Sequence, residues 1–284
     1  MKRRTLNFEF LIEGIGLHKG KDNFVIVKPN IESKGIIFVN PDNGAKIELS
    51  VTNVSSTNRG TVISNGDFSV STIEHLMSCF TAFEIDDAII EIRGDEIPIL
   101  DGSSIMIAEL ISKVGFVEKN IEADFFDLKD DFIYVCGESF YKVEKSEKFI
   151  IDCTYEHEYT GKQRFVFEVN EKNYIKEIAP ARTFGFDYEI EYLRKNNLIR
   201  GGSLENAVVV TKNGVLNGSL RFNDEFVRHK ILDLLGDLKL SNLRFRNIKI
   251  TAKRPSHKGN IGLVKTILAR RSFYEENTRS FRDT

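Results

Sequence analysis

The stretch NDEFVRHKILDLLGDLKL, residues 223–240, carries three side chains that could bind a metal ion or move protons. His229, Asp233 and Asp237 follow one another at intervals of four residues, so on an α-helix they lie on one face. The helix is predicted by an apolar stripe at helical spacing, made of Val227, Ile231, Leu234, Leu235 and Leu238. An imidazole and a carboxylate one turn apart suit two metal ligands. They suit a hydrated polar face equally well, and spacing alone leaves both open.

A third candidate ligand, His75, follows Glu74 in the segment STIEHLM. A glutamate beside a metal-binding histidine is typical of zinc hydrolases, where the carboxylate takes a proton from water. The same segment fits a helix capping box from Ser71 to Glu74, in which Glu74 only accepts a hydrogen bond from the Ser71 backbone N–H. Taken by itself, the segment favours the capping box, and a lone His75 is more typical of an ordinary helix histidine.

Two further segments bring polar groups together. KRPSHKGN places His257 between a predicted strand and a predicted helix, where an imidazole could act as an acid. Lys253, Arg254 and Lys258 around it suit a bound phosphate and ordinary surface charge equally well. In ARTFGF, Thr183 offers a hydroxyl beside aromatic residues, and the alternative is a turn anchored by two phenylalanines.

Composition sets the class of protein. The 284 residues are enough for two domains, with 41% hydrophobic and 29% charged residues, as in an ordinary globular protein. A formal net charge of −2 does not create a positive electrostatic potential that would attract nucleic acid. The sequence contains no run of about 18 apolar residues, so we expect no integral membrane segment. The N-terminal segment lacks signal-peptide features. Three cysteines without a CxxC spacing indicate reduced thiols, so we expect a cytoplasmic protein.

The elements that must position these residues follow one order in both halves of the chain. Short alternating strands in the first half precede a helix at 71–83, a strand at 88–94 and a helix at 105–115. Strands in the second half precede the helix at 223–240, a strand at 247–254 and a helix at 261–271. The pattern predicts an α+β fold of two similar modules, residues 1–119 and 125–272. The second module carries an additional insert near 184–210.

Several segments together resemble the family of UDP-3-O-acyl-N-acetylglucosamine deacetylases, the zinc enzymes of lipid A synthesis in Gram-negative bacteria. They occur in the family's order over residues 3–268 and read GIGLHKG, TIEHLM, IPILDGSS, ARTFGF, GGSLENAVVV, DEFVRHKILDLLGDL and the pair Ser256-His257. ARTFGF combined with DEFVRHKILDLLGD is highly specific for this family. The resemblance implies hydrolysis of the 2-N-acetyl group of an acylated UDP-amino sugar, the committed step of that pathway.

The resemblance also assigns a cofactor. It implies one catalytic Zn²⁺ ion held by His75, His229 and Asp233, with water in the fourth position. Glu74 matches the general base of the family, and this replaces the capping interpretation. The helix at 223–240 would then supply two ligands, and the third would come from the first half of the chain.

Five other residues match functional positions of the family. His257 matches the acidic histidine, and Asp237 matches the carboxylate that orients it. Thr183 matches the hydroxyl that helps to stabilise the oxyanion. Lys230 and Phe184 match active-site contacts to the substrate.

The family fold consists of two α+β sandwiches whose helix layers face each other, each with a small insert. The second insert forms an apolar passage for the acyl chain, and Leu193, Leu198 and Ile199 are candidates to line it. Tyr155 is a candidate to stack on the uracil base. Arg254 is a candidate contact for the diphosphate, although RPSH departs from the usual form, in which glycine precedes the histidine.

Two other functions stay open at this point. One is a zinc amidohydrolase on the same scaffold with a different substrate. The other is a nucleotide-sugar or lipid binder that has lost catalysis. In all three cases we expect a monomer that binds a small molecule and no nucleic acid.

Overall fold

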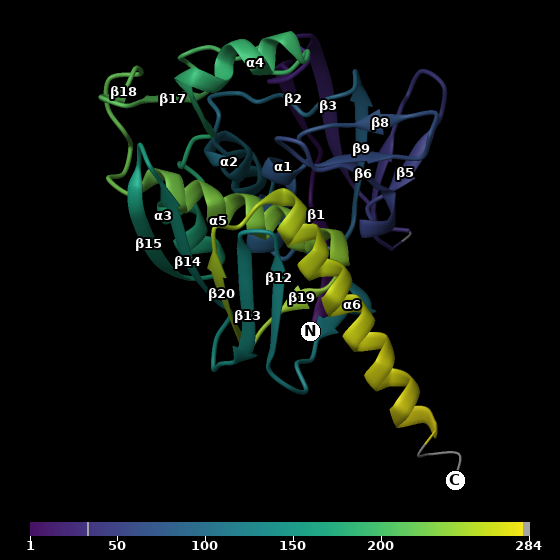
Figure 1. Cartoon of the computed structure of the whole chain (residues 1–284). Helices are drawn as coiled ribbons and strands as arrows, with labels where there is room; N and C mark the ends of the chain where they lie inside the picture. Colours follow the sequence, from purple (N-terminus) through teal and green to yellow (C-terminus); the bar gives the residue numbers. More distant parts are fainter. Residues whose placement is uncertain (33, 281–284) are drawn as a thin grey trace.

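The structure is a computed structural model that describes residues 1–32 and 34–280 (Figure 1). Its first half contains a five-stranded sheet of order β2-β3-β9-β4-β5. Side chains along these strands point alternately to the two faces of the sheet. In β3, for example, Val25 and Val27 are buried, whereas Phe24 on the opposite face is exposed. Only β4 and β9 run parallel. The strands are β2 (Phe10–Ile15), β3 (Asp22–Pro29), β4 (Ile36–Val39), β5 (Lys46–Glu48) and β9 (Ala88–Arg93).

The second half repeats this sheet. Its order is β12-β13-β20-β14-β15, and again only one pair, β14 with β20, runs parallel. The two sheets therefore share the same sequence of antiparallel and parallel neighbours, which confirms the repeated α+β architecture. The strands are β12 (Phe132–Cys136), β13 (Ser139–Lys145), β14 (Ile150–His157), β15 (Gly161–Glu168) and β20 (Ile248–Lys253).

Each half contributes two helices next to its sheet, and the last of them extends beyond the sheets toward the C-terminus (Figure 1). They are α1 (Glu74–Ala82) and α2 (Ile105–Val114) in the first half, and α5 (Glu225–Leu238) and α6 (His257–Ser280) in the second. Every residue of α1 except Thr81 is buried, and so is every residue of α5 except Lys230. A helix buried on all sides is packed between two layers. The polar face of α5 is therefore not exposed to water, which excludes the hydrated-face interpretation of His229, Asp233 and Asp237.

Each half carries an insert between its sheet strands and its central helix. The first insert is a small sheet of β6 (Val54–Ser56), β7 (Val62–Ser64) and β8 (Ser69–Val70), preceded by η1 (Val51–Asn53). The second insert lies at the top of Figure 1 and contains two helical segments on a small sheet. Its elements are β16 (Phe184–Phe186), η2 (Asp187–Glu189), α4 (Ile190–Lys195), β17 (Val208–Thr211) and β18 (Gly214–Val215).

Short elements connect the halves. The first strand, β1 (Lys2–Leu6), pairs with β10 (Phe116–Glu122), and β11 (Phe125–Phe126) pairs with β19 (Arg244–Phe245). Two further short helices, α3 (Glu171–Glu177) and η3 (Lys239–Ser241), complete the chain as far as Ser280. The module boundaries at residues 119 and 125 stay a prediction. Among the described residues, no helix combines the length and the apolar character that crossing a membrane requires.

The close crossing of α1 and α5 depends on Gly236. A Cβ atom at this position would lie 2.2 Å from the backbone oxygen of Glu74 and 2.8 Å from its Cα atom. Alanine favours a helix interior over glycine by about 1 kcal/mol, but forced overpacking against backbone costs about 1–3 kcal/mol. We therefore expect Gly236→Ala to lower the free energy of unfolding by about 1–2 kcal/mol, measured by urea denaturation.

Gly185 provides the matched control, since a Cβ atom there meets no other atom within 4 Å. Gly185→Ala is expected to change the free energy of unfolding by less than about 0.5 kcal/mol. An unchanged urea midpoint in Gly236→Ala would contradict this expectation, because it would mean that the two helices accommodate a methyl group at their crossing without cost.

Candidate metal centre and active site

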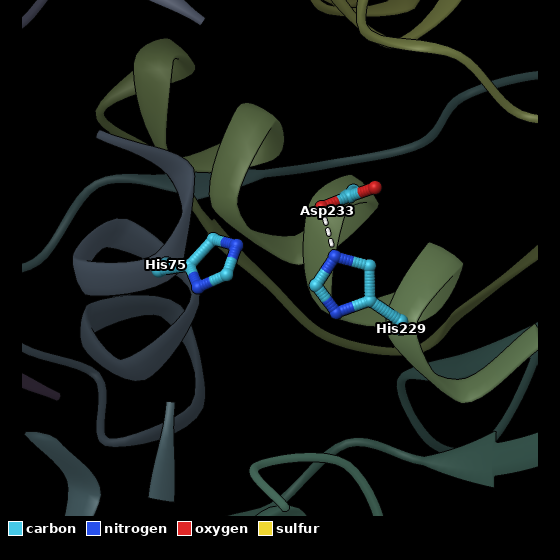
Figure 2. A group of neighbouring side chains, drawn as sticks. All are labelled: His75, His229 and Asp233. Carbon is cyan, nitrogen blue, oxygen red and sulfur yellow. Dashed lines mark ion pairs between the residues drawn. The ribbon is translucent and has the colours of Figure 1, made fainter. Parts of the chain in front are cut away.

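The crossing of α1 and α5 brings together His75, His229 and Asp233, as Figure 2 shows. His75 is the second residue of α1, while His229 and Asp233 lie one turn apart on α5. One potential ligand atom from each residue lies within 4.8 Å of the other two. All three side chains are buried. Two imidazoles and one carboxylate form the donor set of catalytic zinc sites, which leave a further position for water.

The histidines are in the form that binds a metal. The Nδ1 atom of His229 donates to the backbone oxygen of Ala181 at 3.1 Å, so its Nε2 atom is left as the acceptor, 3.3 Å from Asp233 Oδ1. Burial lowers the pKa of His75 to about 3, and neighbouring His229 contributes in the same direction. Burial also lowers the pKa of His229. Both rings are therefore neutral at pH 7.

His75 has an additional property that fits a ligand. Its buried Nδ1 atom makes no hydrogen bond of good geometry within the part of the chain that the structure describes. The Ser103 backbone lies close enough to raise the pKa of the ring slightly, without outweighing burial. A buried ring nitrogen without a protein partner costs free energy unless something else binds there. The three residues thus fit a divalent metal ion.

Asp233 is ionised in this site. Burial raises the pKa of its carboxyl group, but Lys230, His229 and His257 together outweigh burial and lower the pKa well below its usual range. The Nζ atom of Lys230 donates to Asp233 Oδ2 at 2.8 Å. Burial alone would lower the pKa of Lys230, but the negative charge of Asp233 has the larger effect. The pKa of Lys230 is therefore raised above its usual value. Lysine and carboxylate are therefore both charged.

Glu74 lies beside the metal group on the first turn of α1. Its Oε2 atom accepts a hydrogen bond from the backbone N–H of Thr61 at 3.0 Å, and its Oε1 atom is 3.8 Å from His257 Nε2. Burial raises the pKa of Glu74 to about 7, although the charge of His257 acts in the opposite direction. A carboxylate with this pKa exchanges protons readily near neutral pH.

The capping-box interpretation of this segment is wrong. Thr72 has a φ of 58°, outside the helical region, and the helix begins only at Glu74. The backbone N–H of Ser71 donates to the Asp95 backbone oxygen at 3.0 Å. The Glu74 carboxylate therefore does not cap its own helix and binds Thr61 of the first insert's loop instead.

His257, the first residue of α6, forms an ion pair with Asp237 on α5. The Nδ1 atom of His257 donates to Asp237 Oδ2 at 2.9 Å. Burial lowers the pKa of His257, but the carboxylates of Asp237, Asp233 and Glu74 outweigh burial and raise the pKa to about 9. The ring is thus cationic at neutral pH, and it presents Nε2 toward Glu74 and Asp233 at 3.8 and 3.9 Å.

Two residues of this network were missed from the sequence. The hydroxyl of Thr61 donates to Asp237 Oδ1 at 2.5 Å, and the side-chain amide of Asn260 donates to Asp237 Oδ2 at 2.8 Å. The helix predicted at 261–271 begins after Asn260, whereas α6 begins at His257, which puts residues 257 and 260 on one helical face. Thr61 carried no signal either, because only the fold places its loop beside Asp237.

Phe184 and Lys230 contact the metal group, Tyr155 packs on Phe184, and Thr183 precedes Phe184 in the chain. The backbone N–H of Thr183 donates to the Gly102 oxygen at 2.7 Å. The ring of Phe184 lies 6.0 Å from that of His229 and 5.5 Å from that of Tyr155, measured between ring centroids. The Nζ atom of Lys230 lies 5.3 Å from the centroid of Phe184. These residues form one aromatic and cationic side of the site.

A cavity of about 220 Å³ adjoins Thr183 and Phe184. Its lining is mainly apolar and includes Leu17, Phe184, Ile190, Leu193, Ile199 and Leu216. Of the three candidates for an apolar passage, Leu193 and Ile199 line this cavity. Leu198 does not line it, and its backbone N–H donates to the Leu193 oxygen at 2.9 Å. Ile199 has a φ of 51°.

Arg254 lies at the end of β20, outside the group described so far. Its side chain is exposed, and its Nη1 atom is 3.2 Å from Glu138 Oε2. The backbone N–H of Arg254 donates to the Thr154 oxygen at 2.8 Å. An anionic ligand at Arg254 would therefore compete with Glu138.

Comparisons with known proteins agree with this geometry. Residues 3–269 match the family model described as "LpxC: UDP-3-O-acyl N-acetylglycosamine deacetylase". The chain is 42% identical to a UDP-3-O-acyl-N-acetylglucosamine deacetylase of Nautilia profundicola over 96% of its own length and 94% of the relative's. It is 41% identical to the enzyme of that name from Campylobacter lari, over 97% and 94% of the two chains. The chain therefore belongs to the family of UDP-3-O-acyl-N-acetylglucosamine deacetylases.

Proposed function

We propose that this protein hydrolyses the 2-N-acetyl group of UDP-3-O-acyl-N-acetylglucosamine. The products are acetate and UDP-3-O-acyl-glucosamine, and the reaction is the committed step of lipid A biosynthesis. One observation carries the proposal: the metal-ligand group of His75, His229 and Asp233 is buried beside Glu74 and His257, two groups whose pKa values are shifted in a way that suits proton transfer.

The cofactor that we propose is a single Zn²⁺ ion held by His75, His229 and Asp233. Zinc supplies a Lewis acid that polarises an amide carbonyl and lowers the pKa of water toward about 7. The neutral rings of both histidines and the ionised carboxylate of Asp233 support this assignment. The same donor set also accepts other divalent ions such as Fe²⁺.

The protein's own residues then move the protons. Glu74 takes a proton from the water whose oxygen bonds to the acetyl carbon. Thr183 donates a hydrogen bond to the oxyanion that develops, an interaction worth about 3–4 kcal/mol in comparable sites. His257 gives its proton to the sugar nitrogen as the carbon–nitrogen bond breaks, and Asp237 keeps that ring cationic until then.

The substrate is positioned by the surfaces on either side of this chemistry. We propose that the apolar cavity holds the 3-O-acyl chain, with Leu193 and Ile199 in contact with it and Leu198 outside. Phe184 and Lys230 would contact the sugar nucleotide close to the metal group. Two finer proposals are a stack of Tyr155 on uracil and a contact of Arg254 with the diphosphate. The Arg254 contact requires displacing Glu138.

Residues 1–119 and 125–272 are proposed to act as two modules that share one site. Glu74 and His75 would come from the first, and the other ligands and His257 from the second, so neither would be active alone. One chain brings all of these groups together, which supports a monomer. The free thiols of Cys79 and Cys153 are buried, which supports a cytoplasmic location.

The test of this substrate is the release of acetate from UDP-3-O-acyl-N-acetylglucosamine beside the same compound without its acyl chain. Each methylene buried in the apolar cavity contributes about 0.8 kcal/mol. Burial of only four methylenes therefore corresponds to roughly 200-fold in kcat/KM. We expect the deacylated compound to lose at least about 10²-fold.

Equal kcat/KM values for the two compounds would contradict the proposed use of the cavity. Such a result would favour an amidohydrolase with another substrate. A variant of the cavity, Leu193→Ala, is expected to lower kcat/KM for the acylated substrate and to leave the small residual rate of the deacylated compound unchanged.

Replacing Asp237 by asparagine is expected to move the alkaline limb of the pH–rate profile to lower pH. Asp237 is the strongest of the carboxylates that raise the pKa of His257 to about 9. Without its charge that pKa falls toward the usual value of about 6.5, so at pH 8 only about one ring in thirty stays protonated. The expected loss of kcat at pH 8 is therefore roughly thirtyfold, measured with the bound metal quantified in parallel.

Asp152→Asn is the matched control, because Asp152 is also buried but pairs with Arg164 and Lys249 of the second sheet. It should keep the wild-type profile. An Asp237→Asn variant whose alkaline limb does not move would show that Asp237 does not govern the protonation of His257.

A further inference from the structure

A second cavity, which the proposed reaction does not use, lies at the other end of the central helices. It has a volume of about 220 Å³ and is bordered by the C-terminal end of α1 and by η3, which follows α5. Arg4 and Glu84 line it from the first half of the chain, and Asn170, Lys239 and Arg244 line it from the second. Lys239 follows His229 by ten residues, which places it roughly 15 Å away along the helix. We call it the Lys239 cavity.

Lys239 is buried in an unusual way. Its side chain is only 3% exposed, yet its ammonium group has no hydrogen bond or ion pair with any residue that the structure describes. Lysine is almost never this buried unless it is paired. Burial lowers its pKa to about 8, although the nearby charge of Asp86 acts in the opposite direction.

Asp86 does not serve as the missing partner. Its two carboxylate oxygens accept hydrogen bonds from Arg244, from Nε at 3.0 Å and from Nη2 at 2.6 Å. One of them also accepts from the backbone N–H of Arg4 at 2.7 Å. The oxygens of Asp86 are thus occupied by Arg244 and Arg4. Burial raises the pKa of Asp86 and the charge of Lys239 lowers it, but Lys239 lies beyond ion-pair distance of the carboxylate.

Arg4 also lines the Lys239 cavity, but its charge is already paired and its one unbonded donor is enclosed by protein. The Nε atom of Arg4 is buried and makes no hydrogen bond within the described part of the chain. Arg4 keeps looser contacts, with Nη1 3.3 Å from Glu84 and Nε 3.8 Å from Glu118. Arg244, by contrast, has acceptors for all of its donor atoms, including Glu84 at 2.9 Å.

The charges of this lining favour an anion. Three cations, Arg4, Lys239 and Arg244, face the carboxylates of Glu84 and Glu171, and Glu84 is already held by both arginines. An ammonium group without an acceptor at the wall of a cavity calls for an oxygen acceptor that carries negative charge. We propose that the Lys239 cavity binds a small oxyanion, a phosphate or a carboxylate, with Lys239 as its main ligand.

The site lies where both halves of the chain meet, so an anion bound there would stabilise the folded protein by mass action. The experiment titrates the metal-bound, full-length protein with inorganic phosphate, with acetate, and with chloride at equal ionic strength. Binding is followed by calorimetry and by the thermal midpoint. The variant is Lys239→Met, which removes the charge and keeps a similar apolar length.

We expect saturable binding of phosphate or acetate at this site and a dissociation constant at least tenfold weaker in Lys239→Met. Preference for phosphate or for acetate identifies the anion as tetrahedral or as a carboxylate. The control Lys28→Met removes a lysine that pairs with Glu91 in the first sheet and should bind like the wild type. Equal binding in the wild type and in Lys239→Met, or no binding beyond that of chloride, would overturn the proposal. Acetate release plays no part in this test, so its outcome is independent of the proposed reaction.

Discussion

Replacing Glu74 by glutamine is expected to lower kcat for acetate release by about 10²–10⁴-fold, the range of a general base. Glutamine keeps the size of the side chain, and its carbonyl oxygen still accepts the hydrogen bond from the Thr61 N–H. It cannot accept a proton from water. Because Glu74 is not one of the three metal-ligand residues, the bound metal should be retained. Steady-state kinetics on protein with a measured metal content checks both statements.

Glu91 offers a control, since it is partly exposed and pairs with Lys28 away from the site. Glu91→Gln should turn over at nearly the wild-type rate. If Glu74→Gln retained both its metal and a rate within about threefold of the wild type, another group would have to be the base.

Replacing His75 by alanine is expected to remove the metal and, with it, the activity. His75 is the only metal-ligand candidate from the first half of the chain among the described residues, and its Nδ1 atom makes no protein hydrogen bond that the change would break. Lewis acidity contributes several kcal/mol to such reactions, so the loss in kcat/KM should reach about 10³-fold or more. Metal analysis after dialysis, together with kinetics, measures the two effects.

His157 is the control histidine, because its ring stacks on Phe186 and does not belong to the metal group. His157→Ala should retain its metal. A His75→Ala protein that bound the metal as the wild type does would remove His75 from the ligand set.

The architecture could be predicted because it follows from local sequence patterns, the spacing of apolar residues and the order of helices and strands. The order of helix, strand and helix in each half predicted two similar modules, and the two five-stranded sheets repeat one order of neighbours. The stripe from Val227 to Leu238 predicted α5 to within a few residues of its bounds, Glu225–Leu238. The short helices α3 and α4 were missed, since six or seven residues are too few for a periodic signal.

The site could be predicted only in part, for a physical reason. Spacing placed His229 and Asp233 on one helical face, but the approach of His75 depends on the crossing of α1 and α5 at Gly236. The role of Glu74 was ambiguous locally because its partner, Thr61, lies 13 residues away in sequence. Local pattern therefore favoured a cap that the fold does not form.

The cavity shows the same limit on a finer scale. Leu198 and Ile199 were equivalent candidates in sequence, and the positive φ of 51° at Ile199 turns one toward the cavity and the other away. Left-handed backbone at a β-branched residue is uncommon and leaves no clear sequence signal. Tertiary contacts, and not propensity, decide such positions.

The central claim is that a metal ion held by His75, His229 and Asp233 is needed for deacetylation. It is tested most directly by measuring metal content and acetate release on one preparation, before chelation, after chelation and after zinc is restored. Turnover of UDP-3-O-acyl-N-acetylglucosamine is expected to fall in proportion to the metal removed and to return when one equivalent of zinc is bound. Turnover at the original rate by protein that holds less than about one tenth of an equivalent of metal would contradict it.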